Sequence, residues 1–223
     1  MERAKLYRGI LCGLMTLFGL ASVAVGVFQF ARGNTGRGIL AFAGLLFFAA
    51  HYLFHRIGIR PGYGLYGMLY VFLTLAYCLG SALQLFDSIP FFDKISHFLS
   101  GYVFTILGFC LFYLFHGDLR DARDDWLLNA IFAVGFSCLV AVGWEVGEFL
   151  GFVLAGMDSQ QHLTTGVFDT MQDLIACLVA SILCAASFGI YGVTGKKLFT
   201  ARVAEEFFRS NSEGRGPIWT WKR

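Results

Sequence analysis

The sequence predicts an all-α fold, a polytopic membrane protein built as a six-helix transmembrane bundle. The chain has 223 residues, of which 57% are hydrophobic and only 14% are charged. A soluble domain carries about 25% charged residues, so this composition indicates a membrane protein. The apolar residues form continuous runs that are long enough to cross a bilayer as helices, and they lack the alternation of barrel strands.

Six apolar runs are the predicted spans, at about residues 10–30, 39–54, 65–86, 95–115, 127–155 and 171–193. The first follows a basic start without a clear cleavage site, so we interpret it as a retained anchor rather than a signal peptide. The second is short and needs its ends extended. The fifth is long and contains acids, so we expect it to tilt or break. Residues 1–195 therefore form a six-span domain, followed by a basic tail, residues 196–223.

The distribution of basic residues predicts the orientation in the membrane. The termini and the even-numbered loops carry 14 of the lysines and arginines, and the opposite side carries 3. Because basic residues collect on the cytoplasmic side, both termini are expected in the cytoplasm of a plasma-membrane protein. Within the tail, "KKLFTARVAEEFFRS" is expected to form a surface-lying amphipathic helix. The tail is too short and unpatterned to indicate nucleic-acid binding, and the oligomeric state is left open.

Polar residues gather at the outer ends of the last three predicted spans. Their spacings are three or four residues, which places both members of each pair on one helix face. The pairs are Asp93 and His97, Glu145 and Glu148, and Asp169 and Asp173. Ionisable groups inside a membrane are costly and normally face the bundle interior or a wet cavity. We therefore expect these side chains to converge near one leaflet.

Three interpretations of this cluster remain open. Carboxylates with an imidazole are a plausible ligand set for Zn, Mn or Fe, here His97, Glu148 and Asp173. The same groups could supply a general acid and base, with Glu148 and Asp173 as the first candidates and His97, Glu145 and Asp169 beside them. A structural network of neutralised charges is the third interpretation. Asp93 and Lys94 are candidates for substrate binding, with Lys94 as a counter-ion or a contact to an anionic headgroup.

The six cysteines all fall inside the predicted spans, and none forms a C-x-x-C pair. We interpret them as small packing residues rather than as zinc ligands or redox groups.

The order D-K-x-x-H-F, E-x-x-E and F-D-T-x-x-D resembles the YjdF-like family of uncharacterised bacterial inner-membrane proteins and, more distantly, the VanZ-like family. The resemblance covers about residues 92–180. The last motif reads "TTGVFDTMQDL" here, with Phe168 in place of the family's tryptophan and Thr165 where an acid is expected. The resemblance implies a membrane architecture and a residue set, and no reaction. That set is Asp93, Lys94, His97, Glu145, Glu148, Asp169 and Asp173.

The predicted function is an enzyme or binding protein that acts on a lipid-linked or envelope substrate at the outer leaflet, with or without a divalent metal. An anionic lipid is one such partner. A cation or small-solute transporter and a non-catalytic protein with a structural polar network are the alternatives. Carriers usually place their sites near the midplane, between repeated halves. The first three spans carry almost no buried charge and no halves match, so the sequence favours a one-sided site.

Overall fold

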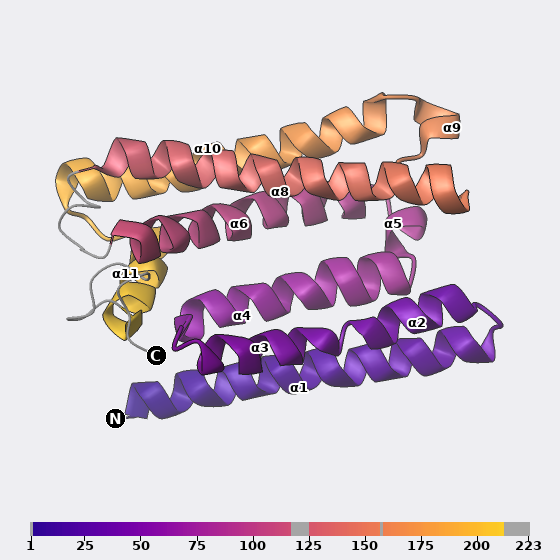
Figure 1. Cartoon of the computed structure of the whole chain (residues 1–223), viewed down its shortest axis with the longest axis horizontal. Coiled ribbons are helices and arrows are strands. Elements are labelled where there is room, and N and C mark those ends of the chain that lie inside the picture. The colour runs from indigo at the N-terminus through magenta and orange to yellow at the C-terminus, as the bar shows by residue number, and fades with distance from the viewer. Residues whose placement is uncertain (1, 117–124, 157, 212–223) are drawn as a thin grey trace. The chain divides into compact units, whose positions relative to one another are not determined.

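The computed structural model describes residues 2–116, 125–156 and 158–211. These residues form helices and turns, with no strand among them (Figure 1). Six helical segments within them are long and apolar enough to cross a membrane. Their bounds are Lys5–Ala31, Thr35–Phe54, Gly62–Ala82, Phe92–Phe115, Trp126–Leu154 and Phe168–Thr194. The predicted all-α class and the predicted six spans are both confirmed.

The chain divides into two compact units. Unit 1 contains residues 1–96 and 203–223, and unit 2 contains residues 97–202. Each boundary falls inside a continuous helix. The first lies within the helix Phe92–His116, whose first turn is counted with unit 1, and the second lies within the helix Phe199–Asn211.

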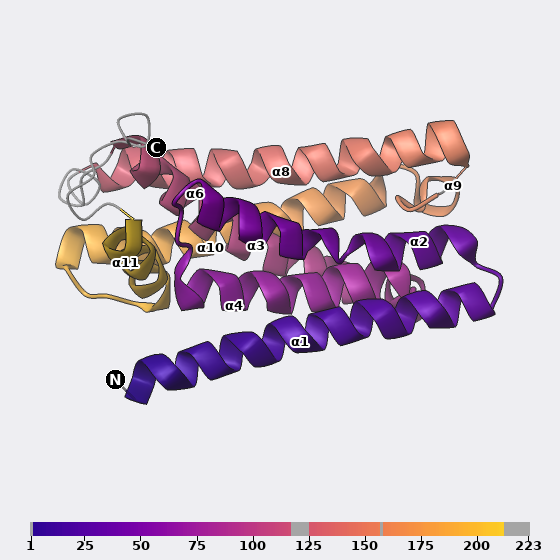
Figure 2. The ribbon, with the colours of Figure 1, turned by 60° about the horizontal axis from the view of Figure 1, so that its bottom comes forward.

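The first three spans of unit 1 lie alongside one another in both views (Figures 1 and 2). Helix α1 covers Glu2–Ala31 and makes the first span. The second span is made of α2 (Thr35–Ala43) and α3 (Leu46–Arg56). The third is made of α4 (Gly62–Phe72) and the π-helix η1 (Leu73–Ala82), and the short α5 (Leu85–Ser88) follows it.

A turn between α2 and α3 interrupts the second span at Gly44. A Cβ atom at Gly44 would lie only 2.8 Å from the Tyr77 ring, so a larger residue there would displace that ring. The Tyr77 hydroxyl donates a hydrogen bond to the Leu40 carbonyl. The same carbonyl also accepts from the Gly44 backbone N–H, at 3.3 Å, so the Tyr77 bond adds a second donor at the end of α2. The two helices of this span run from Thr35 to Arg56, beyond both ends of the predicted span at 39–54, with the interruption at Gly44 between them.

Helix α11 (Phe199–Asn211) is the amphipathic helix expected in the tail. Its apolar side chains Val203, Phe207 and Phe208 are buried in the protein. Glu206 accepts hydrogen bonds from the backbone nitrogens of Tyr63, at 2.7 Å, and Gly64, at 3.1 Å. It therefore caps the first turn of α4, where backbone donors have no intrahelical acceptor. Residues 212–223 of the tail lie outside the described residues.

Unit 2 contains α6 (Phe92–His116, with its first turn counted in unit 1), α8 (Trp126–Ala155), α9 (His162–Thr165) and α10 (Phe168–Thr194). Of the tilt or break expected for the fifth span, the break is absent, and α8 runs unbroken for 30 residues. At 1.5 Å per residue it is about 45 Å long, which exceeds a hydrocarbon core of about 30 Å. It ends at Gly156, whose φ of 67° is the left-handed conformation typical of a helix C-terminus.

Small residues bring α6, α8 and α10 close together. A Cβ atom at Gly101 of α6 would lie 2.3 Å from the Cys177 carbonyl oxygen of α10. The Gly101 carbonyl accepts hydrogen bonds from Ser137 of α8, at 3.1 Å, and from Ser181 of α10, at 3.3 Å. Such contacts are common where membrane helices approach closely. They fix the three helices one turn below His97, which precedes Gly101 by four residues.

Candidate functional site

The candidate site lies in the first two turns of α6 and α10. Helix α6 begins just after Pro90, and Ile89 is extended, as the residue before a proline usually is. His97 is five residues beyond Phe92, so it lies about 8 Å along the helix. Asp173 occupies the corresponding place in α10, five residues beyond Phe168. Parallel helices locked at Gly101 therefore bring these two side chains to the same depth.

The ring of His97 lies between two carboxylates from different helices. Its Nε2 atom is 3.8 Å from Oδ1 of Asp173 and 4.0 Å from Oε1 of Glu145. All three side chains are buried, with exposed fractions of 8% for His97, 5% for Glu145 and 2% for Asp173. These contacts join α6, α8 and α10 at one point.

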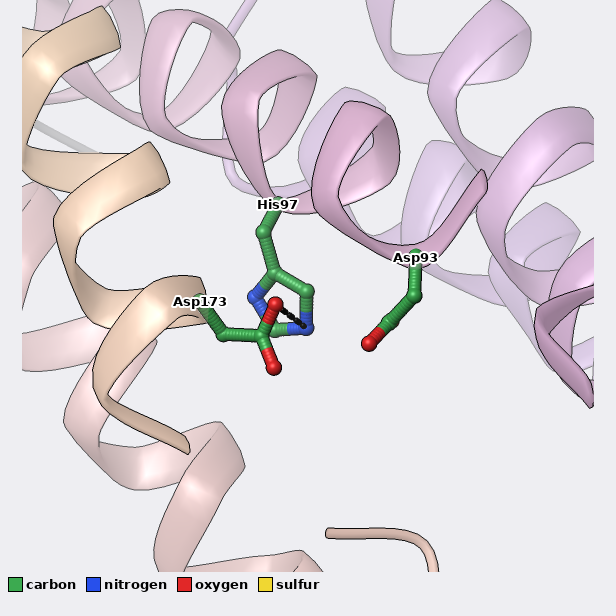
Figure 3. Close-up of side chains that lie close together, drawn as sticks. All are labelled: Asp93, His97 and Asp173. Atoms are coloured by element: carbon green, nitrogen blue, oxygen red, sulfur yellow. Dashed lines mark ion pairs between the residues drawn. The ribbon is translucent and has the colours of Figure 1, made fainter. Parts of the chain in front are cut away.

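Asp93 completes the cluster from the same helix as His97. It lies one turn earlier on α6, so α6 itself sets its position relative to His97. One ligand atom from each of Asp93, His97 and Asp173 lies within 4.8 Å of the other two. Figure 3 shows these side chains converging from α6 and α10, with the ion pair between His97 and Asp173 drawn as a dashed line.

The opposite edge of the His97 ring contacts Cys177. The Cys177 thiol lies 3.8 Å from Nδ1 of His97 and donates a hydrogen bond to the His97 carbonyl, at 3.0 Å. Ser100 donates to the same carbonyl at 2.7 Å and lies 3.2 Å from the sulfur. The ring is therefore held on both edges. The sequence interpretation of Cys177 as a packing residue missed this contact, although Cys177 follows Asp173 by four residues and so shares its helix face.

Glu145 is held by a residue of the connection between α8 and α10. Nε2 of Gln160 donates to the Glu145 carbonyl, at 2.9 Å, and to Oε2 of its side chain, at 3.0 Å. Oε1 of Glu145 is buried and has no hydrogen-bond partner among the described residues. Gln160 thus fixes one oxygen and leaves the other directed at His97. Gln160 is not among the predicted site residues, because it lies in a polar loop without helical periodicity.

The other candidates have different surroundings. Glu148 is half-buried and accepts a hydrogen bond from the Trp144 indole, at 2.9 Å. Lys94 pairs with Asp93 at 3.4 Å, and Asp169 is buried in the first turn of α10. The structure thus places Glu145, one of the predicted candidates, beside His97. Site roles for Glu148, Lys94 and Asp169 stay predictions.

This arrangement has two chemical capacities. An imidazole flanked by carboxylates can take up and release a proton, as a general acid or base does. The same nitrogen and oxygen atoms can bind a divalent cation. The acids of the cluster, Asp93, Glu145 and Asp173, outnumber its basic groups, Lys94 and His97. The cluster therefore favours a positively charged species.

A model of the family described as "Predicted membrane protein (DUF2238)" matches residues 10–193. The match includes every span except the ends of the first and last, and all the candidate site residues. The YjdF-like resemblance is consistent with this family, and the match gives no support to the VanZ-like one. No curated protein and no solved structure shows significant similarity to the chain.

Proposed function

Because the chain belongs to the family of predicted membrane proteins DUF2238, its polar cluster lies in a membrane-embedded helical protein, and we propose that the cluster is a functional site. In this proposal the protein binds or transforms a lipid-linked or envelope substrate at the outer leaflet of the plasma membrane. His97, Glu145 and Asp173 form the reactive centre, and Asp93 and Lys94 lie at its entrance.

The observation that carries the proposal is the buried contact of His97 with two acids from separate helices. Burying a charge costs free energy unless it is paired and hydrogen-bonded. Oε1 of Glu145 is buried without a hydrogen-bond partner among the described residues. A purely structural network would be expected to satisfy that oxygen, whereas a site leaves an acceptor for its ligand or for a transferred proton.

Two features support an outer-leaflet substrate. The basic residues concentrate on the side opposite the cluster, which favours a cytoplasmic location for both termini and an external site. Lys94 is half-buried in the first turn of α6, where its ammonium can contact a phosphate or carboxylate at the membrane surface. A carrier site would be expected nearer the midplane, so the position of the cluster argues against a transporter.

Comparative lipid analysis tests this proposal. The gene is deleted in the source organism, and lipids and lipid-linked envelope intermediates are compared by mass spectrometry with those of the parent strain. We expect one lipid-linked species to accumulate or disappear in the deletion strain. Wild-type protein should restore the profile, and His97→Ala should not.

His162→Ala is the matched control, since it removes an exposed imidazole of α9 and should restore the profile. An unchanged profile in the deletion strain would contradict the proposed substrate class. Restoration by His97→Ala at normal protein levels would contradict the proposed site.

A further inference from the structure

We propose that the cluster binds one divalent cation of the Mn²⁺, Fe²⁺ or Zn²⁺ class, through Nε2 of His97 and carboxylate oxygens of Asp93, Glu145 and Asp173. This inference names a cofactor for the site of the proposed function and rests on it to that extent. The ligand set differs from the one that the sequence suggests, because Glu145 and Asp93 replace Glu148.

The distances from Nε2 of His97 to the acids of α8 and α10 fit a shared ion. Nε2 of His97 lies 3.8 Å from Asp173 and 4.0 Å from Glu145, beyond the reach of about 2.7–3.2 Å for an N–H···O bond. Ligand bonds to such an ion are about 2.0–2.2 Å, so two ligand atoms on one ion lie at most about 4.4 Å apart. Asp93 belongs to the same group, since one ligand atom each of Asp93, His97 and Asp173 lies within 4.8 Å of the others.

Glu145 supplies a second, independent observation. The residue is 5% exposed, and its Oε1 has no hydrogen-bond partner among the described residues. Gln160 binds the other oxygen and so directs Oε1 at His97. A cation between these atoms would satisfy the buried acceptor.

The contacts of Cys177 present Nε2 of His97 as a ligand. Because the thiol donates its proton to the His97 carbonyl, its sulfur is left to accept from Nδ1–H. Nε2 then carries the lone pair that faces the acids. Metal-binding histidines are typically held in this way through their second nitrogen. The sulfur itself contacts the Nδ1 edge, so the ion meets nitrogen and oxygen donors, which favour Mn²⁺, Fe²⁺ or Zn²⁺ over Cu⁺.

The test is metal content and metal binding of the full-length chain. Protein is purified in mild detergent with a histidine-free tag, stripped with a chelator, and titrated with Mn²⁺, Fe²⁺ and Zn²⁺ by calorimetry. Metal retained after gel filtration is measured by mass spectrometry. We expect about one ion per chain in the wild type, as a mononuclear site requires. Binding should be abolished in His97→Ala and at least about tenfold weaker in the isosteric Glu145→Gln.

His162→Ala is the control and should retain wild-type binding, because its imidazole is exposed on α9. A wild-type chain that binds none of the three ions would overturn the metal site. Full binding by folded Glu145→Gln and His97→Ala would overturn the ligand assignment.

The outcome is separable from that of the proposed function. Suppose that Glu145→Gln fails to restore the lipid profile of the deletion strain and that the wild-type chain binds no metal. That result would overturn this inference and leave the proposed function standing. Suppose instead that the wild-type chain binds metal, that both variants lose this binding, and that the lipid profile of the deletion strain is unchanged. That result would support the metal site and overturn the proposed function.

Discussion

The position of the Glu145 side chain depends on Gln160, in the connection between α8 and α10. The Gln160 amide binds both the carbonyl and the side chain of Glu145, so it holds the backbone and the carboxylate at once. The two glutamates of α8 therefore have different surroundings. Glu145 is buried and directed at His97, whereas the Glu148 carboxylate accepts a hydrogen bond from Trp144.

Replacing Gln160 with Ala should loosen the site without unfolding the protein. Two hydrogen bonds are lost, at about 0.5–1.5 kcal/mol each. Oε2 of Glu145 then lacks the hydrogen bond from Gln160, in addition to the unsatisfied Oε1. We expect a modest loss of thermal stability in detergent and a clear reduction in complementation of a deletion strain. Gln172→Ala is the control, because Gln172 is exposed on α10. Equal effects of the two variants would show that Gln160 does not position Glu145.

At the residue scale, the sequence predicts part of the site. Helical periodicity identifies Asp93, His97 and Asp173, because a spacing of four residues suffices to align side chains on one face. It does not choose between Glu145 and Glu148, which are three residues apart and share a face. That choice depends on Gln160, in a loop whose path no periodicity describes.

At the scale of elements, the contact between α6 and α10 positions the cluster. Gly101 lies against the Cys177 backbone, and the Ser137 and Ser181 hydroxyls bind the Gly101 carbonyl. A side chain at Gly101 must therefore push backbone away rather than displace a flexible group.

Gly101→Ala should destabilise the protein by roughly 1–3 kcal/mol, as overpacking of a tight contact does. It should also impair the site, since His97 and Asp173 lie one turn above. Gly135→Ala on α8 is the matched control, because a Cβ atom there meets nothing within 4 Å. Because Gly135→Ala replaces a glycine inside a helix, the stability of this variant should be unchanged or higher by up to about 1 kcal/mol. Thermal unfolding in detergent compares the two, and equal melting temperatures would contradict the close contact.

Helix α11 should stabilise α4 through Glu206. Glu206→Ala removes the acceptor for two backbone donors at the start of α4, and loss of a helix cap costs about 0.5–2 kcal/mol. Glu205→Ala on the same helix should cost less, because its partner Arg209 is exposed and surface pairs contribute about 0–1 kcal/mol. Proteolysis of the α11 segment and thermal unfolding both report this difference. A Glu205 variant as unstable as the Glu206 variant would contradict the capping role.

Hydropathy predicts where the spans lie but not how each is built. The length and continuity of the apolar runs locate all six spans, since the bilayer imposes both. Hydropathy does not predict the turn at Gly44 or the π-helix η1, because it carries no information on contacts such as that between Tyr77 and Leu40. Of the tilt or break expected for the fifth span, the break is absent from α8, and Glu145 has its partners in α6 and the connecting loop.

At the scale of the whole molecule, the proposed function requires the cluster to face outward. The bias of 14 basic residues against 3 favours that orientation. Reporter fusions after Lys94 and within residues 160–165 should therefore give external signals, and a C-terminal fusion a cytoplasmic one. A cytoplasmic signal from residues 160–165 would place the cluster at the inner leaflet and contradict an outer-leaflet substrate.

The central claim is that the polar cluster acts as a site rather than as a structural network. Glu145→Gln tests it most directly. The variant keeps an oxygen to accept the Gln160 hydrogen bond and places an amide nitrogen toward His97, so one charge is removed at nearly constant shape. We measure its melting temperature in detergent and its complementation of a deletion strain, beside His97→Ala and the double variant.

A site predicts lost complementation with an unchanged or raised melting temperature, because functional sites hold charge at the expense of stability. The double variant should be little worse than either single one, since groups that act as a unit are not additive. Parallel losses of melting temperature and complementation, or normal complementation by Glu145→Gln, would contradict the site and favour a structural network.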